Sequence, residues 1–169
     1  MASSSSTFVA CIGLLSFVVA TLLTPCAAQN LPQEFVDLHN AARADVGVGK
    51  VSWDDNLAAY AQSYAQLRQG DCALVHSQGQ YGENILAGPP GADVSPKSAV
   101  GMWVAEKQYY HHDTNSCSAP VGESCLHYTQ VVWHDTTTIG CARVGCNNGG
   151  ALIVCSYNPR GNWANQSPY

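Results

Sequence analysis

The sequence predicts an α+β domain, because three helical patterns and a set of short, mostly antiparallel strand patterns share residues 29–169. The helical patterns come first, and most of the strand patterns follow residue 126. No internal repeat, low-complexity tract or linker divides this part of the chain, whose length suits a single domain. We therefore treat residues 29–169 as one folding unit.

Residues 1–28 are predicted to be a signal peptide rather than part of the domain. An apolar run from Phe8 to Leu23 leads into the small residues of segment 24–28, which is typical of a cleavage site before Gln29. A membrane anchor is the alternative, but the run is shorter than the roughly 20 residues of a spanning helix and contains Gly13. We therefore expect the mature protein to be secreted to the extracellular space.

The first two helices are predicted from their apolar faces and their flanking residues. Residues 32–46 begin with Pro32, which suits the first turn of a helix. Their apolar face consists of Phe35, Leu38, Ala42 and Val46. A second helix is expected after Asp54 or Asp55 as its N-cap, and Gly70 marks its end. Its apolar face consists of Leu57, Tyr60, Ala61, Tyr64 and Ala65.

A short strand at residues 82–87 and a third helix are expected next. Ser95 and Pro96 suit the N-cap and the first turn of this helix. Steps of three and four residues place Glu106 on one face of the helix with Trp103. A carboxylate in that position must be paired, protonated or directed into a cavity, unless it reaches solvent at the edge of the helix.

Three further strands are expected at about residues 127–133, 139–146 and 151–157. The last two are joined by Asn147-Asn148-Gly149-Gly150, a sequence typical of a β-hairpin. In this hairpin Cys141 lies nearly opposite Cys155, within the range that a disulfide can bridge.

All six cysteines outside the signal peptide are expected to form disulfides, because an even number in an exported chain suggests a disulfide framework. Besides the pair in the hairpin, Cys117 and Cys125 would close a short polar loop. Cys72 and Cys146 then remain, and their bridge would tie the second helix to the hairpin. Metal binding by these cysteines is less favoured, because they form no pair of CxxC clusters.

Composition and motifs exclude several classes of function. The chain has 7 Lys and Arg residues, 12 Asp and Glu residues and a formal net charge of −5, which gives no basic patch for nucleic acid. It contains no Gly-x-Ser-x-Gly elbow, no HExxH helix, no Walker loop and no Rossmann fingerprint. With the cysteines paired, no catalytic nucleophile is evident.

Four His and Glu residues are candidates for a functional site: His76, Glu83, Glu106 and His127. Imidazole and carboxylate groups suit zinc and similar cations, and they also suit general acid-base chemistry. Structural roles remain open, since a lone strand histidine such as His127 is often a satisfied structural group. We expect His76 near the end of the second helix, where the helix dipole would favour its charged form.

Five segments of the sequence resemble the plant pathogenesis-related class 1 proteins of the CAP superfamily (cysteine-rich secretory proteins, antigen 5 and pathogenesis-related 1). These segments are Gly82–Ile85, Met102–Glu106, His127–Trp133, Gly145–Gly150 and Val154–Trp163. The resemblance covers residues 29–169. It departs from the family pattern at Leu126, where Gly is usual, and at Ser156, where Asn is usual.

The resemblance implies a three-layer α-β-α sandwich with a mostly antiparallel central sheet and three disulfides. The implied pairs are Cys72–Cys146, Cys117–Cys125 and Cys141–Cys155. It also implies a central cavity that contains His76, Glu83, Glu106 and His127. No cofactor is required, although zinc or another divalent cation is a candidate ligand of these four residues.

The resemblance further implies a monomeric, secreted plant defence protein of the apoplast with antimicrobial activity. Such a protein would bind sterol or another lipid of pathogen membranes, and the apolar stretch Ile85–Pro90 is a candidate contact unless it only packs the core. Hydrolysis that depends on a metal at the His/Glu tetrad is the alternative. A protease could also release residues 159–169 as a defence-signalling peptide by cleavage between Asn158 and Pro159, unless this tail only packs Trp163 against the domain.

Overall fold

The computed structural model describes residues 31–169, so the predicted signal peptide lies outside the described residues. Helices and strands alternate irregularly along this part of the chain, as expected for an α+β domain. The helices are α1 (Leu31–Ala44), α2 (Asp55–Leu67), α3 (Pro96–Ala105), α4 (Leu126–Val131) and the short 3₁₀ helices η1 (Glu106–Tyr109) and η2 (His112–Thr114). The strands are β1 (Ser52–Trp53), β2 (Gly82–Gly88), β3 (Tyr110–His111), β4 (Ser116–Cys117), β5 (Thr138–Gly145) and β6 (Ala151–Asn158).

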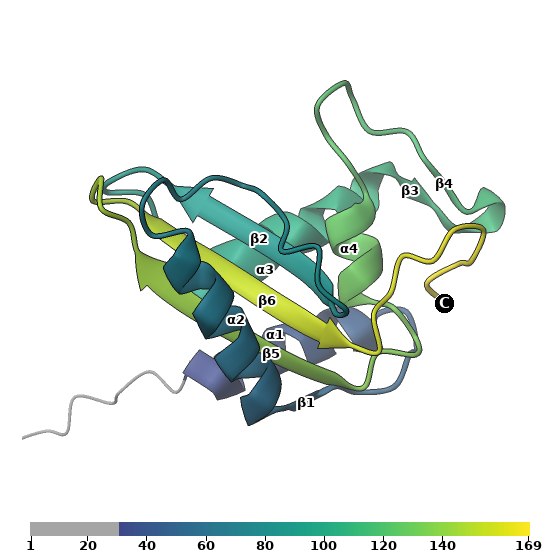
Figure 1. Ribbon diagram of the computed structural model, residues 1–169. Helices are drawn as coiled ribbons and strands as arrows, with labels where there is room; N and C mark the ends of the chain where they lie inside the picture. Colours follow the sequence, from purple (N-terminus) through teal and green to yellow (C-terminus); the bar gives the residue numbers. More distant parts are fainter. Residues whose placement is uncertain (1–30) are drawn as a thin grey trace, which may run out of the picture.

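Four strands form the central sheet in the order β1-β5-β6-β2. The pairs β5–β6 and β6–β2 are antiparallel, and only the short β1 runs parallel to its neighbour β5. Figure 1 shows α2 on one face of this sheet and α1, α3 and α4 on the other. The three-layer sandwich with a mainly antiparallel sheet is therefore confirmed.

Helix α2 begins and packs as its sequence predicts. The Asp54 side chain accepts hydrogen bonds from the backbone N–H groups of Asn56 and Leu57, which caps the first turn. On the sheet side, Gly140 of β5 allows a close approach, because an added Cβ would lie 2.1 Å from the backbone nitrogen of Ala58. Any larger residue at this position would push α2 away from the sheet.

The three expected disulfides are present. The bonds join Cys72 to Cys146, Cys117 to Cys125 and Cys141 to Cys155. Cys141 and Cys155 occupy directly opposed positions of the β5–β6 hairpin, as the hairpin pattern predicted.

The expected strand at residues 127–133 is wrong, because this segment forms helix α4 followed by a turn. The third helix was expected to include Glu106, but α3 ends at Ala105 and Glu106 begins η1. A small second sheet, formed by β3 and β4, was not expected. The contacts that stabilise α4 are part of the functional site and explain the first of these differences.

Candidate functional site

The four candidate residues form two His–Glu pairs. In the first pair, Nδ1 of His76 donates to Oε1 of Glu83 at 2.7 Å, and the backbone N–H of Ser77 donates to the same oxygen at 2.9 Å. Glu83 is carried by β2, and its side chain is only 6% exposed, whereas that of His76 is 52% exposed. A nearly buried carboxylate thus orients a partly exposed imidazole.

His76 lies in the loop between α2 and β2 rather than at the end of α2, which ends at Leu67. Two tyrosines of α2 hold this loop, since the Tyr64 hydroxyl donates to the carbonyl of Val75 and the Tyr60 hydroxyl lies 3.4 Å from Ser77 Oγ. The Cys72–Cys146 disulfide fixes the same loop to the end of β5. The charged form of His76 is therefore favoured by the direct contact with Glu83 and not, as expected, by the dipole of α2.

The pKa values of this pair move in opposite directions. The hydrogen bond to Glu83 raises the pKa of His76 above its usual value, in spite of partial burial. Burial alone would raise the pKa of Glu83, but the hydrogen bonds from His76 and Ser77 outweigh it and lower that pKa. Both shifts favour an ion pair between the two side chains.

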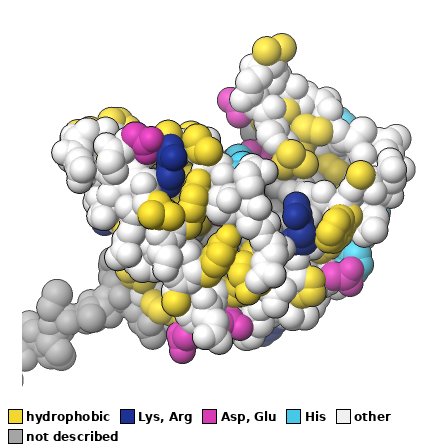
Figure 2. Space-filling view, viewed as in Figure 1, with side chains coloured by type: hydrophobic (Ala, Val, Ile, Leu, Met, Phe, Trp, Pro, Cys, Tyr) yellow, Lys and Arg dark blue, Asp and Glu magenta, His cyan; other side chains and the backbone are white. Residues whose placement is uncertain are grey.

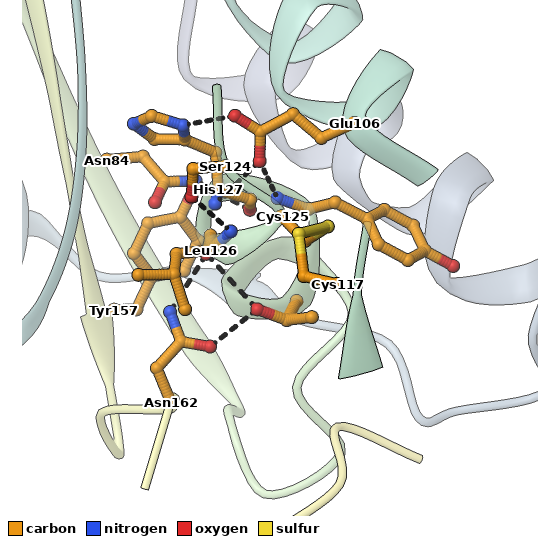
Figure 3. Close-up of polar contacts among 11 residues, drawn as sticks. Asn84, Glu106, Cys117, Ser124, Cys125, Leu126, His127, Tyr157 and Asn162 are labelled. Carbon is orange, nitrogen blue, oxygen red and sulfur yellow. Dashed lines mark hydrogen bonds and ion pairs between the residues drawn. A yellow bond between two sulfur atoms is a disulfide. The ribbon is translucent and has the colours of Figure 1, made fainter. Parts of the chain in front are cut away.

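The second pair joins Glu106 to His127, as Figure 3 shows. Nδ1 of His127 donates to Oε1 of Glu106 at 2.6 Å. The other carboxylate oxygen accepts from the backbone N–H groups of His127 at 2.9 Å and Tyr128 at 3.2 Å. These N–H groups belong to the first turn of α4, so Glu106 caps this helix from a distant part of the chain.

The opposite end of α4 is satisfied by Arg43 of α1. The guanidinium donates to the carbonyls of Val131 at 3.0 Å, Trp133 at 2.8 Å and Thr136 at 2.9 Å. Arg43 is 1% exposed, and its burial lowers its pKa to about 10, so it stays charged at neutral pH. Glu106 and Arg43 together explain why the segment after residue 125 is helical, since they pair backbone groups that strand pairing would otherwise satisfy.

Both histidines line one open pocket of about 490 Å³, together with Glu83, Leu126 and Arg160. Each Nδ1 is bound to a carboxylate, and Nε2 of each imidazole has no hydrogen-bond partner within residues 31–169. Glu106 does not line this pocket and acts behind His127. The structure thus brings His76, Glu83 and His127 to one pocket, with Glu106 as the group that orients His127.

The donor set suits a cation only in part. Carboxylates that fix the Nδ1 groups are typical partners of metal-binding histidines, and Oε2 of Glu83 is buried without a hydrogen-bond partner in the described part of the chain. Across residues 31–169, however, no group of three or more His, Cys, Asp or Glu side chains is arranged to hold a metal ion. A zinc ion here would rely on water or a bound ligand to complete its coordination.

A buried polar chain connects α1 to the pocket, and the sequence did not reveal it. His39 Nδ1 donates to the carbonyl of Phe35, so Nε2 must accept the hydrogen bond of the Tyr157 hydroxyl at 2.9 Å. The amide of Asn84 donates both to the Tyr157 oxygen at 3.1 Å and to the carbonyl of His127 at 3.0 Å. His39 lies four residues after Phe35 on the predicted apolar face, and this spacing was the available signal.

Burial sets the protonation states of this chain. Desolvation lowers the pKa of His39 to about 4, so its imidazole is neutral under most conditions. Burial also raises the pKa of the Tyr157 hydroxyl, which stays protonated and can keep donating. The position of the His127 backbone therefore depends on neutral groups in the core.

The tail after β6 forms one wall of the pocket. Asn162 donates to the carbonyl of Leu126 and accepts from the Thr129 hydroxyl, both on α4. Gly161 donates to Gln130 Oε1 at 3.0 Å and packs so closely on Trp133 that an added Cβ would lie 2.6 Å from the indole. The tail therefore packs on the domain mainly through Gly161 and Asn162 and not through Trp163, whose side chain is 51% exposed.

The apolar stretch Ile85–Pro90 mainly packs the core. Ile85 is 6% exposed, and Leu86 and Ala87 pack against buried clusters, which leaves only Pro89 and Pro90 exposed. Other apolar side chains are more exposed: Leu126, which lines the pocket, by 62%, Leu74 and Val75, which precede His76, by 65% and 49%, and Val121 in the loop between β4 and α4 by 107%. Figure 2 shows a hollowed surface flanked by the projecting loop between β4 and α4, whose tip is apolar.

None of the helices in residues 31–169 is long and apolar enough to cross a membrane.

Known proteins match this chain over most of its length. The model of the cysteine-rich secretory protein family (CAP) matches residues 36–157. Pathogenesis-related protein 1A from Nicotiana tabacum is 54% identical over 156 residues, which cover 92% of this chain and 90% of that protein. Pathogenesis-related protein 1 from Arabidopsis thaliana is 50% identical over 156 residues, which cover 92% and 93% of the two chains.

A solved structure supports the same assignment at the level of the fold. Venom allergen-like protein 4 from Schistosoma mansoni superposes with a TM-score of 0.66 at 24% identity. The match covers 83% of this chain and 94% of that structure. Together with the family match and the two plant relatives, this likeness leads to one conclusion: the chain belongs to the cysteine-rich secretory protein (CAP) family and is similar to the plant pathogenesis-related class 1 proteins.

Proposed function

We propose that the protein is a secreted plant defence protein that acts against pathogens by binding sterol or another lipid of their membranes. The observation that carries this proposal is the combination of a polar pocket with an apolar rim. Two histidines and Glu83 lie in the pocket, which at about 490 Å³ has the size of a small-molecule site. Such a site suits an amphipathic ligand with a small polar head.

The rim would bind the apolar body of the ligand. Leu126 lines the pocket, Leu74 and Val75 directly precede His76, and Val121 belongs to the loop that leads to Ser124 at the pocket edge. Exposed apolar side chains on segments that border a pocket are typical of a binding surface for a lipid or a protein. A sterol would place its single hydroxyl among the pocket side chains and its rings against this rim.

A binding assay with ergosterol and a plant sterol tests the proposal. We expect saturable binding by the wild-type protein and weaker binding by Leu126→Asp and Val121→Asp, since each change introduces a charge on the rim. Met102→Asp is the matched control, because Met102 is 59% exposed on α3 and does not line the pocket. No saturable binding, or equal losses in all three variants, would rule out the proposed rim.

Hydrolysis assisted by a divalent cation is the second candidate function. It is favoured by two imidazoles in one pocket, each oriented by a carboxylate. Calorimetric titration with zinc, paired with a hydrolase screen, tests it on the wild type and on the double variant His76→Ala, His127→Ala. We expect weak zinc uptake without turnover, because two imidazoles give few fixed ligands; turnover that the double variant lacks would establish the enzyme.

Release of residues 159–169 is a third part of the proposal. Asn158 and Pro159 are exposed at the end of β6, so a protease could reach the bond between them. The peptide would then have to leave its contacts with α4, including those of Asn162. Mass spectrometry of extracellular fluid after pathogen challenge tests this step, and an uncleaved tail would count against it.

A further inference from the structure

A second pocket of about 230 Å³ lies between the tail, α4 and the β3–β4 hairpin. It adjoins the histidine pocket, and both are lined by Leu126 and Asn162. The histidines and glutamates of the first site do not line it. Its chemistry is therefore distinct from that of the proposed lipid site.

Every residue that lines this second pocket is uncharged. Three aromatic side chains contribute: Tyr110, Trp133 and Trp163. Four amide side chains contribute as well: Asn115, Asn162, Asn165 and Gln166. Aromatic faces combined with amides, in the absence of any charge, suit a ligand that is neutral and rich in hydroxyl groups.

The two tryptophans of this pocket differ in their exposure to solvent. Trp163 is 51% exposed, and the Arg160 guanidinium lies 5.1 Å from its ring centroid, so the cation covers one ring face. Trp133 is 1% exposed, and its indole N–H is buried without a hydrogen-bond partner in residues 31–169. Trp133 is therefore a buried part of the pocket wall, and Trp163 is the indole that a ligand can reach.

The amides divide into a fixed set and a free set. The Asn115 side chain donates to the carbonyl of Gln166 and accepts from the Tyr110 hydroxyl, and the Asn162 side chain is bound to α4. The side chains of Asn165 and Gln166 are exposed and make no hydrogen bond within the described part of the chain. Each amide offers both donors and an acceptor, which matches the donor and acceptor roles of a hydroxyl group.

We propose that this pocket binds one ring of a neutral saccharide. The C–H face of the sugar ring would pack against the indole of Trp163, since the negative face of an aromatic ring attracts weakly positive hydrogens. Its hydroxyls would pair with the free amides of Asn165 and Gln166. The volume is below the roughly 300 Å³ at which drug-sized pockets begin, so the rest of a longer chain would stay in solvent.

Other ligand classes fit the pocket less well. A purely apolar ligand would bury amide groups without partners, which is costly. An acidic saccharide would find no cation among the lining residues, because the nearby Arg160 lines the histidine pocket and covers one face of Trp163, and the protein as a whole carries a net charge of −5. The neutral saccharide is therefore the ligand that pairs the largest share of the lining groups.

NMR titration of the full mature protein with chitotetraose, cellotetraose and tetragalacturonate tests the proposal. We expect at least one of the two neutral tetramers to shift the indole N–H of Trp163 and the side-chain amides of Asn165 and Gln166, with saturation in the millimolar range. The acidic tetramer should bind more weakly. If neither neutral tetramer shifts these resonances, or if the acidic tetramer binds equally well, the proposal is wrong.

Variants separate this pocket from the rest of the surface. Trp163→Ala should weaken binding of the neutral tetramer at least about fivefold, since exposed aromatic anchors carry much of the affinity of such sites. Trp163→Phe should retain part of it. Met102→Ala is the control for loss of an exposed side chain elsewhere and should leave the affinity unchanged. Unchanged affinity in a folded Trp163→Ala protein would contradict the assignment.

Discussion

Glu106 and His127 are joined at 2.6 Å, and the same carboxylate caps the helix that carries His127. One side chain thus orients the imidazole and also stabilises the local backbone. This double role explains why Glu106 can stand behind the pocket, without lining it, and still determine its geometry.

Glu106→Gln is expected to lower the free energy of unfolding by about 1–3 kcal/mol, because the helix loses a charged cap and His127 loses an ionised acceptor. Urea denaturation measures the loss, and NMR reports the tautomer of His127. Glu123→Gln is the control, since Glu123 is exposed and does not line the pocket. Equal stability of the Glu106 variant and the wild type would contradict the proposed cap.

Arg43→Met is expected to cost at least about 3 kcal/mol of stability, because the carbonyls of Val131, Trp133 and Thr136 lose their donor. Arg43→Lys should recover only part of this loss, since an ammonium group lacks the planar fork of the guanidinium. Hydrogen exchange should show faster opening of α4 in both variants. If Arg43→Lys is as stable as the wild type, a positive charge alone stabilises these carbonyls and the planar guanidinium is not required.

Stability is expected to fall as the pH drops below 6.5, because His39 binds a proton in the unfolded chain before it does so in the folded one. The pKa of His39 is lowered to about 4 in the folded protein, so the loss extends from pH 6.5 down to about 4. In this range the free energy of unfolding should fall by up to about 1.4 kcal/mol per pH unit. Denaturation of the wild type and of His39→Gln at several pH values tests this. The free energy of unfolding of His39→Gln should depend less on pH between 6.5 and 4, and an unchanged dependence would exclude His39 as its source.

The His76–Glu83 pair is expected to stabilise the protein most between the unfolded pKa values of its two groups. The raised pKa of His76 gives stability that is complete below pH 6.5 and is lost as the pH rises through the folded value. The lowered pKa of Glu83 gives stability that is present above pH 4.5 and is lost as the pH falls through the folded value. In Glu83→Gln, NMR titration should find the pKa of His76 lower than in the wild type, and an unchanged value would disprove the pairing.

Much of the fold could be predicted because its signals are local. Asp54 caps α2, Asn147–Gly150 turns the hairpin, and Cys141 opposes Cys155 by simple register. These features depend on residues close together in the sequence or paired across one turn. The grouping of the four His and Glu residues was expected only from the family resemblance, since their positions span three elements and a loop.

Helix α4 could not be predicted in the same way. Thr129, Val131 and Val132 are β-branched, so the local pattern favours a strand. The helix forms because Glu106 and Arg43, both distant in sequence, pair the backbone groups at its two ends. Spacing could place His39 and Arg43 on α1, but it could not identify the partners that make their burial favourable.

We propose above all that a sterol or another lipid binds in the pocket that His76 and His127 line. An NMR titration of the mature protein with micelle-solubilised ergosterol, read on the imidazole resonances, tests it most directly. We predict saturable shifts of both imidazoles and of Leu126, with Met102 unaffected. Saturable ergosterol binding that leaves His76 and His127 unshifted would contradict this account.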